Sequence, residues 1–248
     1  MTVIIGMLSI TSGIAQHSTT YLNDLSADLL YAIKVNQPYE EFKEALEAHS
    51  YEAISDSLQS DAQKKAFWIN VYNAYTQIRL GKEPQTYSNR YRFFKKDFIS
   101  LGGKELSLND IEHRILRRQH ALFGGGYFRN LFKKKFANDW QVDSLDTRIH
   151  FALNCGAASC PPIAFYEPET IDKDLDAARL AYLSSETTVD TAENAVRVPK
   201  ILSWYRGDFG GKKGVLQLLK DLEVIEKDNS YKLKFKDYNW EIEEKYLE

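Results

Sequence analysis

The chain has 248 residues, a formal net charge of −3, and ordinary contents of hydrophobic and charged residues, 44% and 27%. This length suits one domain with appendages, and the hydrophobic content can fill a sizeable core. The small negative net charge argues against nucleic acid as the main partner, because phosphate binding requires a basic surface.

The N-terminus predicts an exported protein, periplasmic or secreted. Residues 3–14 are apolar, and residues 13–15 resemble a small-x-small cleavage site before Gln16. This pattern indicates a secretory signal peptide over residues 1–15. No other stretch of about 18 apolar residues occurs, so we expect no membrane-spanning segment in the mature protein.

Helical patterns dominate the first third of the chain. Residues 21–58 contain three short ones, which predict a helical N-terminal extension over residues 16–59. Residues 61–81 form the strongest pattern, and it is apolar on nearly every side. A helix of this kind is buried in the protein core.

One polar stripe interrupts that apolar helix, and it contains Asn70, Asn73 and Gln77. Buried amides need hydrogen-bond partners, since each unpaired group costs about 1–3 kcal/mol. Two interpretations have equal weight. The stripe is either a structural network that holds neighbouring loops, or the polar wall of a pocket.

Residues 107–117 predict a second helix with a glutamate in its apolar face. At α-helical spacing Glu112 lies among the apolar side chains, whereas Asp110, His113 and Arg117 point away from the core. A buried carboxylate is costly unless it is paired. We therefore expect Glu112 to orient a histidine or to hold an arginine, and His113 to be a solvated or rim histidine.

The segment TRIHFALNCGAASCPPI, residues 147–163, holds both cysteines of the chain. Its apolar first half predicts a buried strand, with His150 and Asn154 on one face and Cys155 on the other.

The C-terminal third predicts further strands. A strand near residue 196 leads into a packed corner at Arg206-Gly207-Asp208, and two strands flank a turn at residues 228–229. Helices first and strands later indicate an α+β fold, with a helical N-terminal layer packed on a mixed or antiparallel sheet.

Five blocks in this order carry a family resemblance: AFWINVYNAYT, LSLNDIEHRILR, RIHFALNCGAASCPPI, ILSWYRGDF and YNWEI. Together they resemble DUF547, a domain of unknown function found in bacteria, plants and animals. The resemblance covers roughly residues 60–242 and implies one α+β domain over residues 60–248. In plants the domain follows a coiled-coil segment, in proteins described as partners of transcription factors. This chain has no heptad segment, so that role is not transferred to it.

The first functional hypothesis is a cysteine-dependent hydrolase or acyltransferase that acts on an amide or thioester. Such a site needs a thiolate, a base and a group that orients the base. Cys160, ranked slightly ahead of Cys155, is the candidate nucleophile, with His150 as the base and Glu112 as its partner. We expect Glu112 and His150 to lie within a hydrogen bond or one water of each other.

The same hypothesis includes binding residues and a fold analogy. Backbone amides of residues 155–160 can form an oxyanion hole, and Asn70, Asn73, Asn154 and Ser159 are candidate binding residues. A histidine beside a cysteine-bearing turn is similar to permuted papain-like enzymes, by analogy only.

The alternative hypothesis is a binding module without chemistry, whose partner is a small molecule or a peptide. Cys155 and Cys160 would then be a structural disulfide or inert packing groups. A metal site is the least favoured option, because the spacing H-x4-C-x4-C matches no common zinc pattern. We expect no metal and no cofactor.

Overall fold

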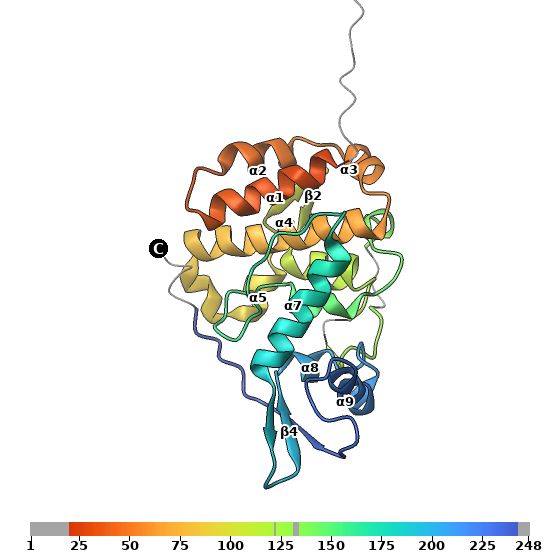
Figure 1. The fold of residues 1–248 in the computed structure, drawn as a ribbon. Helices are drawn as coiled ribbons and strands as arrows, with labels where there is room; N and C mark the ends of the chain where they lie inside the picture. Colours follow the sequence, from red (N-terminus) through yellow and green to blue (C-terminus); the bar gives the residue numbers. More distant parts are fainter. Residues whose placement is uncertain (1–19, 122, 131–133, 243–248) are drawn as a thin grey trace, which may run out of the picture.

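The computed structural model describes residues 20–121, 123–130 and 134–242 (Figure 1). The predicted signal peptide, residues 1–15, lies outside the described residues.

The N-terminal helices form a layer over one long buried helix (Figure 1). The layer contains α1 (Tyr21–Lys34), α2 (Glu40–Glu47) and α3 (Tyr51–Ser57), and the buried helix is α4 (Asp61–Lys82). A capping box between Ser60 and Gln63 starts α4, as the two residues satisfy each other's backbone N–H groups. The predicted helices are confirmed. The layer packs mainly on α4, however, through α1, and α2 also contacts a strand, β1 of the small hairpin.

Of the other elements, α7 is the longest, with 16 residues. The helices and helical turns that follow are η1 (Pro84–Ser88), α5 (Arg90–Lys95), η2 (Asp110–Leu116), α6 (Ala137–Trp140), η3 (Thr147–Phe151), α7 (Ile171–Glu186), α8 (Ile201–Trp204) and α9 (Gly211–Asp221). The strands are β1 (Ile99–Leu101), β2 (Lys104–Leu106), β3 (Thr188–Asp190), β4 (Ala195–Val198) and β5 (Lys232–Phe235).

The strands form two small sheets. β1 and β2 pair as an antiparallel hairpin. In the second sheet β4 lies in the middle, antiparallel to β3 and parallel to β5. The fold is thus α+β in the broad sense, with helices dominant and a mixed three-stranded sheet at the end of the molecule opposite α1 (Figure 1).

Two strand predictions are wrong. Residues 147–151 form the 3-10 helix η3, because the Asp146 side chain accepts a hydrogen bond from the Arg148 N–H and caps the turn. The first of the two predicted C-terminal strands is absent. There Glu223 adopts a positive φ of 57° and the Val224 N–H bonds back to Leu219, so the chain turns at the end of α9.

η3 connects the two hydrophobic cores of the protein. Ile149 belongs to the larger core, built around α1 and α4, and Phe151 belongs to the smaller core, built around α8 and α9. His150 lies between Ile149 and Phe151 in the sequence and is also buried. A titratable side chain therefore lies where the two cores meet.

The C-terminal segment after β5 returns along the side of the molecule (Figure 1). It reaches the cysteine loop, where the Ala158 N–H donates to the Glu241 carbonyl at 2.8 Å and Ala157 bridges Ile242. This return brings Tyr238 and Trp240 to the region of His150 and the cysteines.

Candidate functional site

The candidate site begins at η2, which is a π-helical turn. The Arg117 N–H donates to the carbonyl of Glu112, five residues earlier, and Gln119 repeats this spacing with Arg114. π-Helical turns are rare and are frequently found at functional sites.

This geometry overturns the prediction that Asp110, His113 and Arg117 point into solvent. Their exposed fractions are 3%, 4% and 0%. The prediction assumed α-helical spacing and could not include their partners: Arg117 bonds to Asp208 and His113, and Asp110 accepts from the Ser107 hydroxyl. Glu112 is buried as expected, with 8% exposure.

Glu112 is held by two tyrosines. The Tyr205 hydroxyl donates to Oε1 at 2.5 Å, and the Tyr72 hydroxyl donates to Oε2 at 3.4 Å. Burial raises the pKa of both tyrosines well above the ordinary value, so they keep their protons. Burial alone would raise the pKa of Glu112 too, but the positive charge that His113 gains in acid, the Tyr205 hydrogen bond and the Arg117 charge outweigh it. The pKa is lowered, and Glu112 is ionised at neutral pH.

A second carboxylate, Asp208, is part of a buried network of hydrogen-bonded charged and polar side chains. Arg117 donates to both of its oxygens, at 2.9 and 3.0 Å, and His150 Nε2 lies 2.8 Å from Oδ2. Burial raises the pKa of Asp208, but the bonds to His150 and Arg117 dominate and lower it to about 2. Arg117 extends the network to His113, with 2.7 Å between Nη1 and Nδ1.

The partners fix the proton position on each histidine. Burial lowers the pKa of His113 to about 4 and lowers that of His150 as well, so both rings are neutral at pH 7. Arginine can only donate, so His113 Nδ1 is an acceptor and Nε2 carries the proton. An ionised Asp208 can only accept, so His150 carries its proton on Nε2. His150 Nδ1 then has a free lone pair.

Tyr205 links the two halves of this network. Its ring stacks on His150, with 3.9 Å between centroids and 14° between planes, while its hydroxyl binds Glu112. The structure has no direct hydrogen bond between Glu112 and His150 among the described residues. Tyr205 is the group that contacts both.

These residues face a cavity of about 420 Å³, which is a common size for a small-molecule site. Phenylalanine, tyrosine and tryptophan form the largest group in its walls, seven of the seventeen described lining residues. The described residues that line it are Tyr72, Phe94, Asn109, Glu112, His113, Phe123, Gly124, Gly125, His150, Leu153, Cys155, Ile201, Ser203, Trp204, Tyr205, Tyr238 and Trp240. Among them only Glu112 is charged at neutral pH, because both histidines are neutral.

Aromatic rings form one wall of this cavity. Tyr238 lies 4.7 Å from Trp204 and 4.6 Å from Trp240, measured between ring centroids. The Arg90 guanidinium lies 4.7 Å from the Trp240 ring centroid but does not line the cavity.

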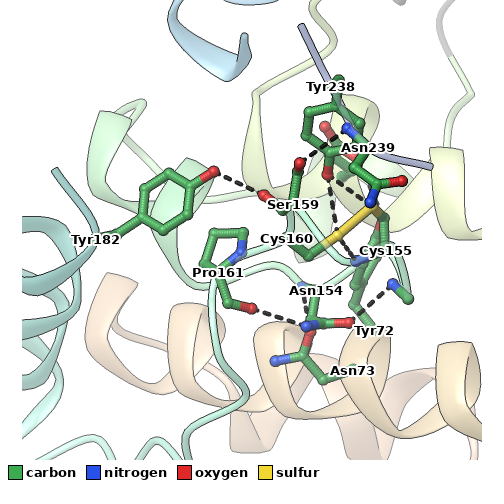
Figure 2. Close-up of a disulfide and its surroundings, with 12 residues drawn as sticks. Tyr72, Asn73, Asn154, Cys155, Ser159, Cys160, Pro161, Tyr182, Tyr238 and Asn239 are labelled. Carbon is green, nitrogen blue, oxygen red and sulfur yellow. Dashed lines mark hydrogen bonds between the residues drawn. A yellow bond between two sulfur atoms is a disulfide. The ribbon is translucent and has the colours of Figure 1, made fainter. Parts of the chain in front are cut away.

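The two cysteines form a disulfide at the edge of the cavity (Figure 2). Cys155 lines the cavity and Cys160 does not. The Tyr238 hydroxyl lies 3.1 Å from each sulfur, and the Cys155 N–H donates to Cys160 Sγ at 3.0 Å. In this state neither cysteine has a free thiol.

The asparagines hold the cysteine loop from below (Figure 2). Asn73 donates to the Ala152 carbonyl and accepts from the Asn154 N–H, at 3.0 and 2.8 Å. Asn154 in turn donates to Pro161 and accepts from the Gly156 N–H. These contacts correspond to the structural-network interpretation of the amide stripe.

The other two candidate binding residues also contact backbone. Asn70 donates to the Tyr166 carbonyl and accepts from its N–H. The Ser159 hydroxyl accepts from the Asn239 N–H at 2.9 Å and fastens the C-terminal segment. Of the eight candidate site residues, the cavity thus brings together Glu112, His150 and Cys155.

Sequence reasoning missed Arg117, Tyr205, Asp208 and Tyr238 as members of the site. The signal was present, because ILSWYRGDF and YNWEI are two of the five blocks that carry the family resemblance. No role was assigned to them, because Asp208 lies 91 positions from Arg117 and Tyr205 lies 93 from Glu112, and pairs so far apart show no local periodicity.

Two classes of site receive no support from the described residues. Within residues 20–121, 123–130 and 134–242, no three histidine, cysteine, aspartate or glutamate side chains converge as metal ligands would. In the same ranges, no helix combines the length and apolar character needed to cross a membrane.

Comparison with known proteins identifies one family. The model of the family described as "Protein of unknown function, DUF547" matches residues 55–183. No curated protein and no solved structure matches the chain. The matched range contains Glu112, His113, Arg117, His150 and both cysteines. The predicted boundary at residue 59, between a helical extension and the family domain, stays a prediction.

Proposed function

We propose, for a chain that belongs to the DUF547 family, that it is a binding protein for small organic cations with an apolar body. One observation carries this proposal. Among the described residues that line the cavity, Glu112 carries the single formal charge, and seven of the seventeen are phenylalanine, tyrosine or tryptophan. Aromatic faces attract cations through their quadrupole, and a carboxylate in the same cavity adds a direct ion pair.

The charge balance of the buried network supports the same ligand class. Arg117 and Asp208 neutralise each other, and both histidines are neutral, so Glu112 leaves the network with a net charge of −1. Two tyrosine hydroxyls occupy only part of the accepting capacity of its oxygens. A ligand ammonium group can therefore still bind there, whereas an anion would meet repulsion.

Calorimetric titration with three matched probes tests the proposal: phenethylammonium, 2-phenylethanol and phenylacetate. They share a benzene ring and differ in the charge of the head group. We expect the cation to bind about tenfold or more tightly than the other two, since a hydrogen bond to a charged group contributes roughly 1.5–3 kcal/mol. Glu112→Gln should remove this preference. Glu226→Gln, which removes an exposed glutamate, is the matched control.

The proposal fails if the neutral or anionic probe binds as tightly as the cation, or if no probe binds. It also fails if Glu112→Gln and Glu226→Gln bind the cation equally well.

A second candidate is the cysteine-dependent hydrolase or acyltransferase, in the reduced state of the protein. It is favoured by one observation: Cys155 lines the same cavity as His150, whose Nε2 is held by Asp208. The Nδ1 lone pair of His150 would serve as the base, in a role analogous to papain-like sites. Because Cys155 and not Cys160 lines the cavity, this candidate now takes Cys155 as the nucleophile.

Alkylation of the reduced protein with iodoacetamide across pH 5 to 9 separates the two candidates. An activated Cys155 should label fast well below pH 8.5, the ordinary thiol pKa, and His150→Gln should shift this profile upward. Reduced protein should then cleave model thioesters, and oxidised protein should not. A labelling profile with an ordinary thiol pKa removes this candidate.

We also propose that the protein is exported. The apolar residues 3–14 support a signal peptide, and the Cys155–Cys160 disulfide suits an oxidising compartment. N-terminal sequencing of the protein recovered from the periplasm or medium tests this, with Gln16 as the expected first residue. Recovery of full-length protein from the cytoplasm alone would contradict it.

A further inference from the structure

We propose that the disulfide is a reactive one: a small thiol that enters the cavity attacks Cys155, and Cys160 is the leaving group. This activity requires only that a thiol reaches the cavity. It does not depend on the charge of the ligand that the cavity binds, so it can stand or fall separately from the proposed function.

Access from the cavity favours attack on Cys155. Both cysteines are partly exposed, but only Cys155 lines the cavity. A thiol in the cavity therefore meets Cys155 Sγ first. In thiol–disulfide exchange the choice of the attacked sulfur is decided largely by access and by which departing sulfur is the better leaving group.

Hydrogen-bond donors stabilise Cys160 as the leaving group. Cys160 Sγ accepts a hydrogen bond from the Cys155 N–H at 3.0 Å and lies 3.1 Å from the Tyr238 hydroxyl (Figure 2). Burial raises the pKa of Tyr238, so this hydroxyl keeps its proton and can donate. Donors that face a sulfur stabilise its thiolate and make it a better leaving group.

No comparable pair of donors faces Cys155 in the described residues. Its sulfur shares the Tyr238 hydroxyl, at 3.1 Å, and no backbone N–H donates to it. The two sulfurs thus differ in the number of hydrogen-bond donors that face them. This geometry favours cleavage of the S–S bond with Cys160 as the leaving thiolate.

An external thiolate forms a new S–S bond to Cys155 Sγ, and the bond between Cys155 and Cys160 breaks with its electron pair on Cys160. The products are a mixed disulfide on Cys155 and a thiolate on Cys160. A second external thiolate then attacks the external sulfur of the mixed disulfide and releases the oxidised small molecule and the Cys155 thiolate. Two thiols supply the two electrons.

The experiment treats the folded, oxidised protein with 2-mercaptoethanol, quenches early time points with iodoacetamide, and maps both modifications by mass spectrometry. We expect the mercaptoethanol adduct on Cys155 and the alkyl group on Cys160. In urea-unfolded protein this selectivity should disappear, because the donors no longer face Cys160.

Two tyrosine variants test the role of the donor. Tyr238→Phe removes the hydroxyl that faces the sulfurs, and exchange should slow roughly tenfold or more, as expected for loss of a hydrogen bond to a charged group. Tyr182→Phe is the matched control. Its hydroxyl donates to the Ser159 carbonyl in the same loop at 2.7 Å and contacts no sulfur. Circular dichroism confirms that each variant is folded.

Three results would overturn the proposal: adducts distributed equally between the cysteines, no exchange until the protein unfolds, or equal rates in the two tyrosine variants. Substituting cysteamine and 3-mercaptopropionate for mercaptoethanol adds a separate readout. Exchange without a preference for the cationic thiol would leave this proposal intact and count against the proposed function.

Discussion

Arg117 and Asp208 form an ion pair with no solvent exposure on either side chain, although 91 residues separate them in the sequence. Arg117 donates from Nε and Nη2 to the two carboxylate oxygens, at 2.9 and 3.0 Å. The pair ties η2 to the corner that follows α8. It also places Asp208 within 2.8 Å of His150 Nε2, so one buried contact orients the histidine of the cavity.

Breaking this pair should destabilise the protein strongly. Arg117→Met leaves Asp208 as a buried charge without its main partner, and such changes cost about 3–5 kcal/mol. Urea denaturation measures the free energy of unfolding. Adding Asp208→Leu to Arg117→Met should recover part of the loss, because the uncompensated charge is then gone.

The control for this prediction is an exposed pair of the same type. Lys227 and Glu223 lie 2.8 Å apart with side chains 61% and 75% exposed, so Lys227→Met should leave the urea midpoint unchanged. If Arg117→Met and Lys227→Met changed the free energy of unfolding equally, burial of the Arg117–Asp208 pair would contribute nothing to stability.

Acid should destabilise the protein before its carboxylates titrate. The pKa of His113 is lowered by burial to about 4, below the ordinary 6.5 of an unfolded histidine. Between these values the unfolded chain binds the proton more readily, so stability is complete above pH 6.5 and falls as the pH drops toward 4. His113 alone contributes roughly 3 kcal/mol to this loss.

Urea denaturation at several pH values between 7 and 4 measures this effect. His113→Gln should reduce the pH dependence in that window, since glutamine does not titrate, and the remainder belongs to His150, whose pKa is also lowered by burial. Asp208, with a pKa of about 2, adds its own loss only below pH 4. A variant with the same pH dependence as the unmodified protein would contradict the assignment to His113.

Asn73 should be important for stability and not for ligand contact. Asn73→Ala leaves the Ala152 carbonyl and the Asn154 N–H without their buried partner, at a cost of roughly 1–3 kcal/mol for each group. Thermal or urea denaturation measures the loss, and Asn138→Ala, at an exposed asparagine, is the control. Undiminished stability of Asn73→Ala would mean that water replaces the amide.

Gly156 should not tolerate a side chain. Its φ is 88°, and a β-carbon would collide with Leu80 Cδ1 on α4. Gly156→Ala therefore combines backbone strain with overpacking, which typically costs about 1–3 kcal/mol by itself. Gly103→Ala is the control, because Gly103 has a φ of 64° but open space around it. Melting temperatures of the two variants should differ, with Gly156→Ala lower.

The sequence by itself determined the helical half of the fold and the family. The three helices of residues 21–58 and the helix from Asp61 are confirmed, because the helical spacing of apolar residues is a local signal. It also determined that Glu112 is buried and that Asn70 and Asn73 need partners. The family resemblance came from blocks of consecutive residues, which need no tertiary information.

Only the tertiary structure determines which residues pair with the side chains of the site. His113 was predicted to be solvated or at a rim, and Arg117 to point away from the core, whereas both are buried and Arg117 bonds to Asp208 and His113. His150 was placed on a strand, whereas a side-chain cap at Asp146 makes the segment a 3-10 helix. The C-terminal segment supplies Tyr238 after a long return path, and charge pairing over such distances leaves no periodicity in the sequence. Burial of charged groups is decided by what packs against them, and that is known only once the chain has folded.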